Sequence, residues 1–163
     1  MIITTKREEL LKPLLLVGNV VQRRQTLPIL SNVLLRGDAG GHLELVATDL
    51  EVEIRARAAV EVQDPGEVTL PARKLMDICR ALPDGADIRL EIEGERATLR
   101  SGRGRYSLGT LPAADYPTIE PSGAAQALTL PSGVLRRLME KTQFAMAQQD
   151  VRYYLNGMLF EFA

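Results

Sequence analysis

The chain has 163 residues, of which 20 are Lys or Arg and 21 are Asp or Glu, so its formal net charge at pH 7 is −1. A lone Cys79 excludes an internal disulfide, and Cys79 with the single His42 cannot supply the roughly four ligands of a zinc site. No apolar run approaches the roughly 20 residues that cross a bilayer, and the charged start MIITTKREEL is not expected to be a signal peptide. We therefore expect a cytoplasmic globular protein, and the near-zero charge disfavours a tight, nonspecific nucleic-acid binder.

Helices are predicted where apolar residues recur at helical spacing. These stretches run from Leu10 to Val21, from Leu75 to Leu82 and from Leu135 to Met146. Pro71 and Pro131 stand just before the second and third stretches, where a missing N–H group costs little. Each helix is expected to follow a short strand.

Strands are predicted after the first two helices, from the short apolar run Asn32–Arg36 and from runs that alternate apolar and polar residues. These runs are Asn32–Arg36, His42–Thr48 and Leu50–Val60 in the first half, and Ile88–Ile92, Ala97–Leu99 and Tyr106–Thr110 in the second half. Gly-rich segments between them favour tight hairpins. The unit of strand, helix and three strands therefore occurs twice, and we expect both units to form one antiparallel sheet layer with both helices packed on it.

An internal repeat supports this division of the chain. Thr69–Leu75 reads TLPARKL and recurs as Thr129–Leu135, which reads TLPSGVL. The Pro-rich segment 112–123 reads as a linker, so the sequence predicts an α+β protein with one domain at residues 1–120 and the start of a second at 121–163. The third unit supplies a helix and a strand over 155–162 but no further strands, so we expect a fragment of a longer protein.

Catalytic motifs are weak. There is no phosphate-binding loop, no GxGxxG and no nucleophile elbow, and His42 reads as a surface residue beside the Gly40-Gly41 turn. Cys79 falls on the apolar face of a helix, where an inert buried thiol is usual. Asp84 and Asp87 imitate a metal-binding pair, but neighbouring carboxylates are usually solvated. We expect neither catalysis, nor a metal, nor another cofactor.

Basic side chains are concentrated on the second and third predicted helices. Cations outnumber acids there: Arg73, Lys74 and Arg80 against Asp77, and Arg136, Arg137 and Lys141 against Glu140. Helices on a common face would make that face basic, and such side chains can contact phosphates without reading sequence.

Two predicted connections could add to this surface. Arg24 follows the first helix in a polar connection, and it could equally be a solvent-facing residue. Gln149, Tyr153 and Tyr154 cluster in another connection, where the rings could stack on unpaired bases or pack in a core or turn.

Several segments carry a family resemblance. They are Leu27–Leu30 (LPIL), Ala47–Glu51 (ATDLE), Val68–Lys74 (VTLPARK), Asp77–Arg80 (DICR), Thr110–Pro117 (TLPAADYP) and Gln149–Gly157 (QDVRYYLNG). Through them the sequence resembles the bacterial DNA polymerase III beta subunits, the replicative sliding clamps, over essentially its whole length.

The resemblance implies a DNA-clamp fold of three similar domains, each a pair of the repeated unit. It also implies a head-to-tail homodimeric ring around double-stranded and primed DNA, with helices lining the hole and sheets outside. The function implied is that of a non-catalytic processivity factor that tethers the replicative polymerase. Clamp-loader and polymerase subunits would bind through short peptide motifs, in a bacterial cytoplasm near the nucleoid and without a membrane.

Three groups of residues match family positions. The DNA-contacting group is Arg24, Arg73, Gln149, Tyr153 and Tyr154. The group at the subunit interface is Lys74, Arg103, Arg105, Tyr106 and Leu108. Arg152 and Leu155 match the edge of the partner-peptide pocket, and Gln25 departs from a family Pro beside Arg24.

Two other functional classes stay open from the residues. One is a protein-interaction module whose sheet edge binds partners while DNA plays no part. The other, less favoured, is a nuclease or nucleotidyl enzyme, which metal-dependent turnover would reveal.

Overall fold

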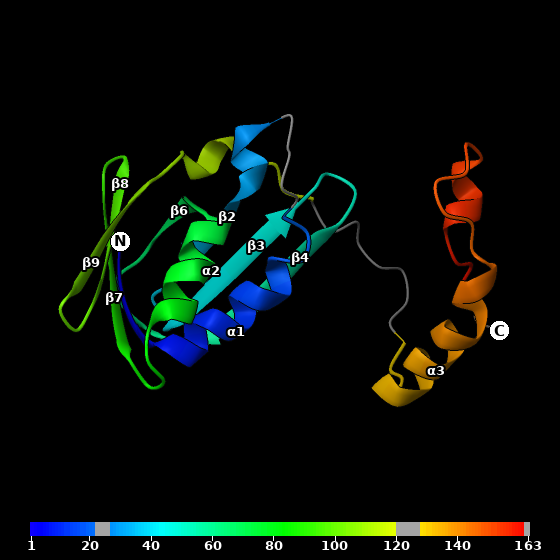
Figure 1. The fold of residues 1–163 in the computed structure, drawn as a ribbon, viewed down its shortest axis with the longest axis horizontal. Coiled ribbons are helices and arrows are strands. Elements are labelled where there is room, and N and C mark those ends of the chain that lie inside the picture. The colour runs from blue at the N-terminus through cyan, green and yellow to red at the C-terminus, as the bar shows by residue number, and fades with distance from the viewer. Residues whose placement is uncertain (22–26, 120–127, 162–163) are drawn as a thin grey trace. The chain divides into compact units, whose positions relative to one another are not determined.

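The computed structural model describes residues 1–21, 27–119 and 128–161, and it divides into two compact units, Met1–Glu120 and Pro121–Ala163 (Figure 1). The first unit contains β1 (Ile2–Lys6), α1 (Arg7–Val17), η1 (Pro28–Ser31), β2 (Asn32–Gly37), β3 (His42–Thr48), β4 (Glu53–Ala59), β5 (Glu61–Asp64), β6 (Gly66–Pro71), α2 (Ala72–Ala81), β7 (Asp87–Glu93), β8 (Arg96–Ser101), β9 (Gly104–Gly109) and η2 (Ala113–Asp115). The second contains α3 (Ser132–Thr142), η3 (Gln143–Ala145) and η4 (Tyr153–Asn156). The predicted strand–helix–three-strand order is confirmed twice, as β1-α1-β2-β3-β4 and β6-α2-β7-β8-β9, with the short polar strand β5 added between them.

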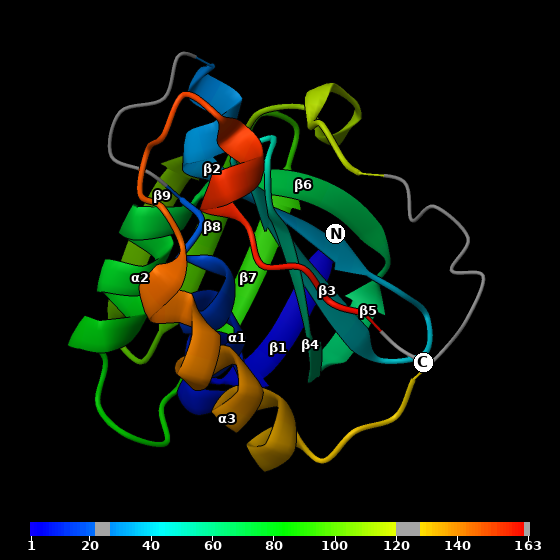
Figure 2. The ribbon, with the colours of Figure 1, turned by 90° about the vertical axis from the view of Figure 1, so that its right-hand side faces the viewer.

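The prediction of one sheet layer is wrong, because the strands form two antiparallel sheets. Their orders are β5-β1-β7-β8-β9 and β4-β3-β2-β6. The predicted strand Leu50–Val60 is shorter in the structure, Glu53–Ala59, and just beyond its end the N–H of Val60 donates to the carbonyl of Gly41 at 2.9 Å, in line with the β3–β4 pairing. Gly41 has a φ of 79°, and a Cβ there would lie 3.1 Å from the Val60 oxygen, so glycine permits this close approach. The chain then passes into β5, which pairs with β1 of the other sheet (Figure 2).

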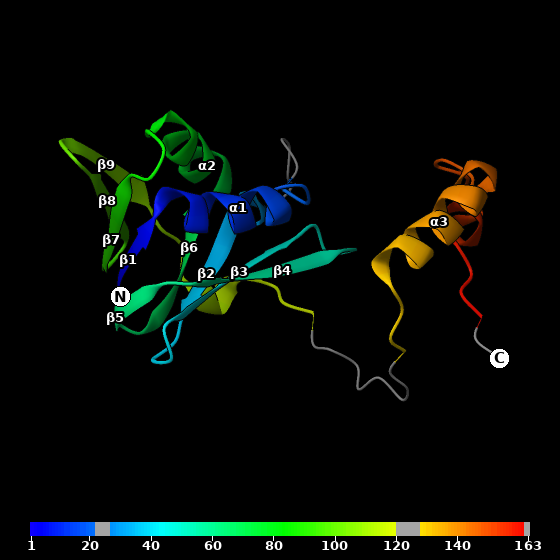
Figure 3. The ribbon, with the colours of Figure 1, turned by 90° about the horizontal axis from the view of Figure 1, so that it is seen from below.

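Helices α1 and α2 pack against each other and lie on the same side of the four-stranded sheet (Figure 3). Their predicted apolar faces are buried: Leu10, Leu14 and Val17 from α1, and Leu75 and Cys79 from α2, are at most 1% exposed. They contact the inward-facing side chains of both sheets in one core. The first helix begins at Arg7 and ends at Val17, and Val21 is buried beyond its end.

A chain of polar groups ties two neighbouring strands of the four-stranded sheet to the segment after β9. Asn32 on β2 donates to the Thr69 hydroxyl on β6, at 2.9 Å, and that hydroxyl donates to the carbonyl of Leu111, also at 2.9 Å. Thr69 and Leu111 additionally form a backbone bridge, which links β6 to the segment after β9. The linker that follows is fixed by Tyr116, whose hydroxyl donates to the Asn32 carbonyl.

The prediction of a strand over 155–162 is wrong for the part that the structure describes. Tyr153–Asn156 forms the 3₁₀ turn η4, residues 157–161 have no regular secondary structure, and 162 lies outside the described residues. A strand needs a neighbour for its backbone N–H and C=O groups, and residues 128–161 contain no other strand to pair with. Among the described residues, no helix is long and apolar enough to span a membrane.

Candidate nucleic-acid interface

The outward face of α2 is basic. Because Leu75, Met76 and Cys79 are buried, Arg73, Lys74 and Arg80 project to solvent. One Arg73 guanidinium nitrogen lies 3.4 Å from the carbonyl of Val21, the last described residue before 22–26. Arg24 and Gln25 lie outside the described residues.

The exposed positions of α1 have a different character. Glu8 and Glu9 begin the helix, Lys12 follows, and Leu15 and Leu16 are 40% and 54% exposed. Among the described residues, the net positive charge of the helical face therefore comes from α2, while α1 presents two acids, one lysine and apolar side chains.

Four of the predicted interface residues lie in or directly before β9, an edge strand of the five-stranded sheet, and the fifth, Lys74, lies on α2. Lys74, Arg103 and Arg105 are exposed, and Tyr106 is half-buried. Leu108 is only 5% exposed and belongs to the core, because it faces inward opposite Ala97. The edge of β9 therefore offers arginines and backbone groups, with Leu108 packed beneath them.

A row of arginines on the outer face of this sheet was missed by the sequence reasoning. Arg89, Arg100 and Arg105 stand opposite one another on β7, β8 and β9, an arrangement in which like charges repel. Glu91 offsets the repulsion: its carboxylate lies 2.7 Å from Arg89 and 3.7 Å from Arg100. The hydrogen bond from Arg89, together with the charges of Arg100 and Arg105, lowers the pKa of Glu91. The sequence shows the period-two spacing of charged residues within a strand. It does not show the pairing register between strands, which brings these arginines together.

In the second unit, the loop from Gln149 to Asn156 carries the exposed tyrosines. Tyr153 and Tyr154 are 82% and 68% exposed, with ring centroids 6.1 Å apart and an edge-to-face angle of 77°. Their rings are therefore available for stacking and are not packed in a core. Gln149 is exposed and has a φ of 58°, a backbone conformation that residues other than glycine rarely adopt.

Arg152 is engaged within the same loop. Its Nε and Nη2 lie 3.1 and 3.0 Å from the two carboxylate oxygens of Asp150, in a bidentate pair. The side-chain hydrogen bond from Arg152, reinforced by its backbone N–H, lowers the pKa of Asp150. The pair holds both residues charged at neutral pH.

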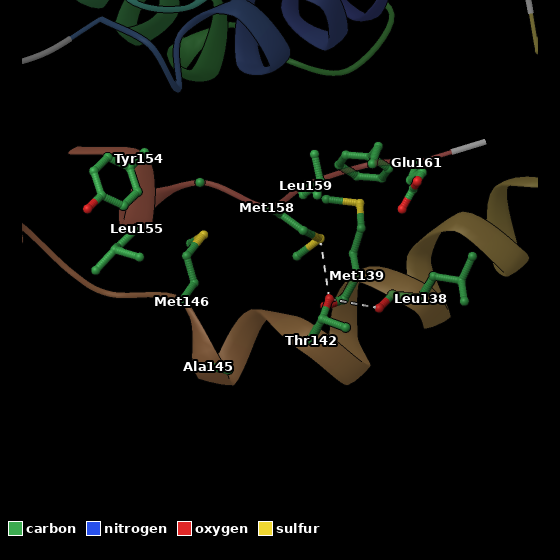
Figure 4. A pocket seen from close by; sticks show the side chains of 12 residues that line it. Leu138, Met139, Thr142, Ala145, Met146, Tyr154, Leu155, Met158, Leu159 and Glu161 are labelled. Atoms are coloured by element: carbon green, nitrogen blue, oxygen red, sulfur yellow. Dashed lines mark hydrogen bonds between the residues drawn. The ribbon is translucent and has the colours of Figure 1, made fainter. Parts of the chain in front are cut away.

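An apolar pocket of about 470 Å³ lies beside this loop, between α3 and the segment after η4 (Figure 4). Leu138 and Met139 come from the helix, and Met158 and Leu159 come from the facing segment. Leu155, 37% exposed, is among the residues that line this pocket, and Arg152 is not. Apolar walls of this kind suit the side chains of a bound peptide.

Cys79 and His42 occupy the positions predicted for them. Cys79 is buried, and burial raises the pKa of its thiol to about 11, so little nucleophilic thiolate forms at neutral pH. His42 is exposed beside a turn, with Nδ1 3.6 Å from Asp38. Among the residues that the structure describes, no group of three His, Cys, Asp or Glu side chains converges as in a metal site.

A duplicated strand–helix–three-strand unit, with two helices packed on one side of antiparallel sheets, defines an α+β protein of the DNA-clamp type. Comparison with known proteins agrees. The family described as DNA polymerase III beta subunit, N-terminal domain, matches residues 1–120, and the corresponding central domain matches 129–163. The chain therefore belongs to the DNA polymerase III beta-subunit family, the bacterial sliding clamps.

Individual relatives give the same answer. The chain is 56% identical to the beta sliding clamp of Escherichia coli K12 over 159 residues, which are 97% of this chain and 43% of that protein. It matches the crystal structure of the DNA polymerase III beta subunit of Pseudomonas aeruginosa with a TM-score of 0.93 and 52% identity, over 97% of this chain and 43% of that one. The Caulobacter crescentus pol III beta structure has a TM-score of 0.91 and 43% identity, over 96% of this chain and 42% of that one. The chain thus spans less than half the length of these relatives.

Proposed function

We propose that this chain acts as part of a non-catalytic DNA sliding clamp, a ring subunit that holds the replicative polymerase on duplex DNA. The observation that carries the proposal is the relationship to the beta clamps over 97% of the chain, together with the basic outward face of α2. A ring that encircles DNA does not need tight binding, because it cannot leave sideways. A modest basic surface on a chain of net charge −1 fits such a mechanism.

The DNA contacts proposed fall on two surfaces. Arg24 and Arg73 would meet backbone phosphates, where long cationic side chains bind without reading sequence. Gln149, Tyr153 and Tyr154 would meet the single-stranded template at a primer junction, and the exposure of both rings supports this role, since stacking on one base contributes roughly 1–3 kcal/mol.

The protein contacts proposed are separate from the DNA contacts. The edge of β9, with Arg103, Arg105, Tyr106 and the buried Leu108, would pair head to tail with a second clamp subunit, and Lys74 of α2 would belong to the same interface. An unpaired strand edge invites such augmentation, and arginine and aromatic side chains suit interfaces. Leu155, which lines the pocket beside α3, would contact polymerase and clamp-loader peptides. Arg152 is assigned to the same peptide site by its family position alone. The protein would work in the bacterial cytoplasm, near the nucleoid.

The test is a primer-extension assay on primed circular DNA with polymerase and clamp loader. The full-length gene product should lengthen the products made in a single binding event, and unchanged product lengths would refute the proposal.

A protein-interaction module without DNA binding is the second candidate, favoured by the strand edge and the apolar pocket. Binding to primed DNA that weakens as salt rises separates the two, since phosphate contacts release counterions.

A further inference from the structure

The Gln149–Asn156 loop is held in shape by the side chain of one residue, Asn156. Its Oδ1 accepts the N–H of Asp150 at 2.9 Å, and its Nδ2 donates to the carbonyl of the same residue at 3.0 Å. One amide therefore satisfies both backbone polar groups of Asp150, as a neighbouring strand would. Asn156 and Asp150 are both half-buried, so these bonds are partly shielded from water.

These bonds act directly on the conformation of Gln149. A φ of 58° is costly for a residue with a Cβ, and such a conformation persists only when its surroundings fix it. The two hydrogen bonds of Asn156 fix the backbone of Asp150, the residue after Gln149. On the other side, the N–H of Ala147 donates to the carbonyl of Leu155 at 3.0 Å. The chain on both sides of Gln149 is thus tied to two consecutive residues of η4.

The same element determines where the tyrosines lie. Tyr153 and Tyr154 immediately precede the two anchoring residues in η4, and both rings project to solvent. The polar groups of Asp150 are used within the loop, because its carboxylate accepts three hydrogen bonds from Arg152. The residues of η4 that tie the loop, Leu155 and Asn156, are therefore different from the residues that expose their rings, Tyr153 and Tyr154.

We propose that Asn156 is a positioning residue that preorganises Gln149, Tyr153 and Tyr154 for primed DNA. This inference rests on the proposed function and deepens it. Asn156 itself contacts no DNA, since both ends of its amide are bonded to Asp150. Its effect is on the fraction of molecules whose loop is ready to bind, and the apparent affinity falls in proportion to that fraction.

The experiment is a double-mutant cycle with the full-length gene product and a fluorescent primed duplex that carries a single-stranded template overhang. Asn156→Ala and Gln149→Ala should each weaken binding, the first by about tenfold if one loop in ten stays competent. The double variant should bind no more weakly than the weaker single variant, because Asn156 acts through the loop that presents Gln149. The matched control is Gln143→Ala, on the neighbouring η3, which should bind like the parent.

A second readout separates positioning from general stability. Hydrogen exchange at the Asp150 amide should accelerate in Asn156→Ala while the thermal unfolding midpoint stays unchanged. Should Asn156→Ala fail to fold, Asn156→Ser, whose hydroxyl can replace one of the two hydrogen bonds, takes its place in the cycle. Additive losses in the double variant, or parental affinity in Asn156→Ala, would overturn the inference. Parental affinity in Gln149→Ala and in Tyr153→Ala would overturn the assignment of this loop to DNA, and the inference with it.

Discussion

The buried hydroxyl of Thr69 links β6 to Asn32 on the neighbouring strand β2 and to the Leu111 carbonyl after β9, and its removal should destabilise the first unit. Thr69→Val keeps the shape of the side chain and removes only the hydroxyl, so no cavity forms. The Nδ2 group of Asn32, 5% exposed, then loses the acceptor it has at 2.9 Å. The Leu111 carbonyl keeps its bond from the Thr69 N–H.

The expected loss of stability comes from one hydrogen-bond donor, the Asn32 Nδ2 group, which is left without its acceptor. Leaving a buried polar group without a partner costs about 1–3 kcal/mol, so the free energy of unfolding should fall by about 2 kcal/mol. For a unit of this size, a loss of that magnitude lowers the thermal midpoint by about 6–12 °C.

The assay is urea unfolding followed by circular dichroism, with Thr98→Val on β8 as the matched control. Thr98 is half-buried on the outer face of its strand, and the control should stay within about 0.5 kcal/mol of the parent. In an Asn32→Ala background, Thr69→Val should cost little, because the orphaned amide is gone. A full cost in that background would refute the reasoning.

The remaining predictions concern charge and thiol chemistry. Arg73→Ala should weaken duplex DNA binding uniformly across sequences and reduce the slope of log K against log salt by about 0.9. The control Arg57→Ala, on β4, should leave both the affinity and the slope unchanged. Equal slopes for the parent and the two variants would count against a phosphate contact by Arg73. Because the folded-state pKa of Glu91 is lowered, its contribution to stability is present above the ordinary glutamate pKa of about 4.3 and is lost as the pH falls through the lower folded value. Glu91→Gln should therefore unfold at lower urea than the parent at pH 7, and the gap should close in acid; a gap independent of pH would contradict this. Cys79, buried with a pKa of about 11, should react with iodoacetamide far more slowly in the native protein at pH 8 than in urea, and equal rates would show that the thiol is accessible.

Much of the fold follows from local pattern. Helices α1 and α2 were predictable from their apolar stripes, and the starts of α2 and α3 from the prolines before them. Each of these patterns spans only one or two helical turns of sequence. The alternation along β3 and β7 likewise places their inward faces correctly, whereas β2, predicted from a short apolar run, is buried on both faces. Such features depend on near neighbours, which a single sequence displays.

The misses depend on partners that are distant in the chain. β5 pairs with β1, a strand of the other sheet that lies more than 50 residues earlier in the chain, and local alternation does not reveal that partner. The strand predicted over 155–162 came from the third repeat unit, but a strand also requires a second strand for its backbone groups, and the sequence pattern alone does not supply one.

The residues of the candidate site likewise fall into those that the sequence could identify and those that only the structure shows. Residue type and segment resemblance singled out Arg73, Tyr153 and Tyr154, all of which are exposed. The sequence could not show that Leu108 is buried beneath β9, nor that Asn156 bonds to Asp150. Those facts depend on register and loop closure.

The most direct test of the central claim compares retention on circular and linear DNA of the same sequence. The full-length gene product, loaded by a clamp loader onto a nicked circle, should remain bound through gel filtration at moderate salt. Cutting the circle once should release it, because a ring held by topology slides off a free end. Equal retention before and after the cut would show that the protein is held by direct affinity, and it would contradict the account.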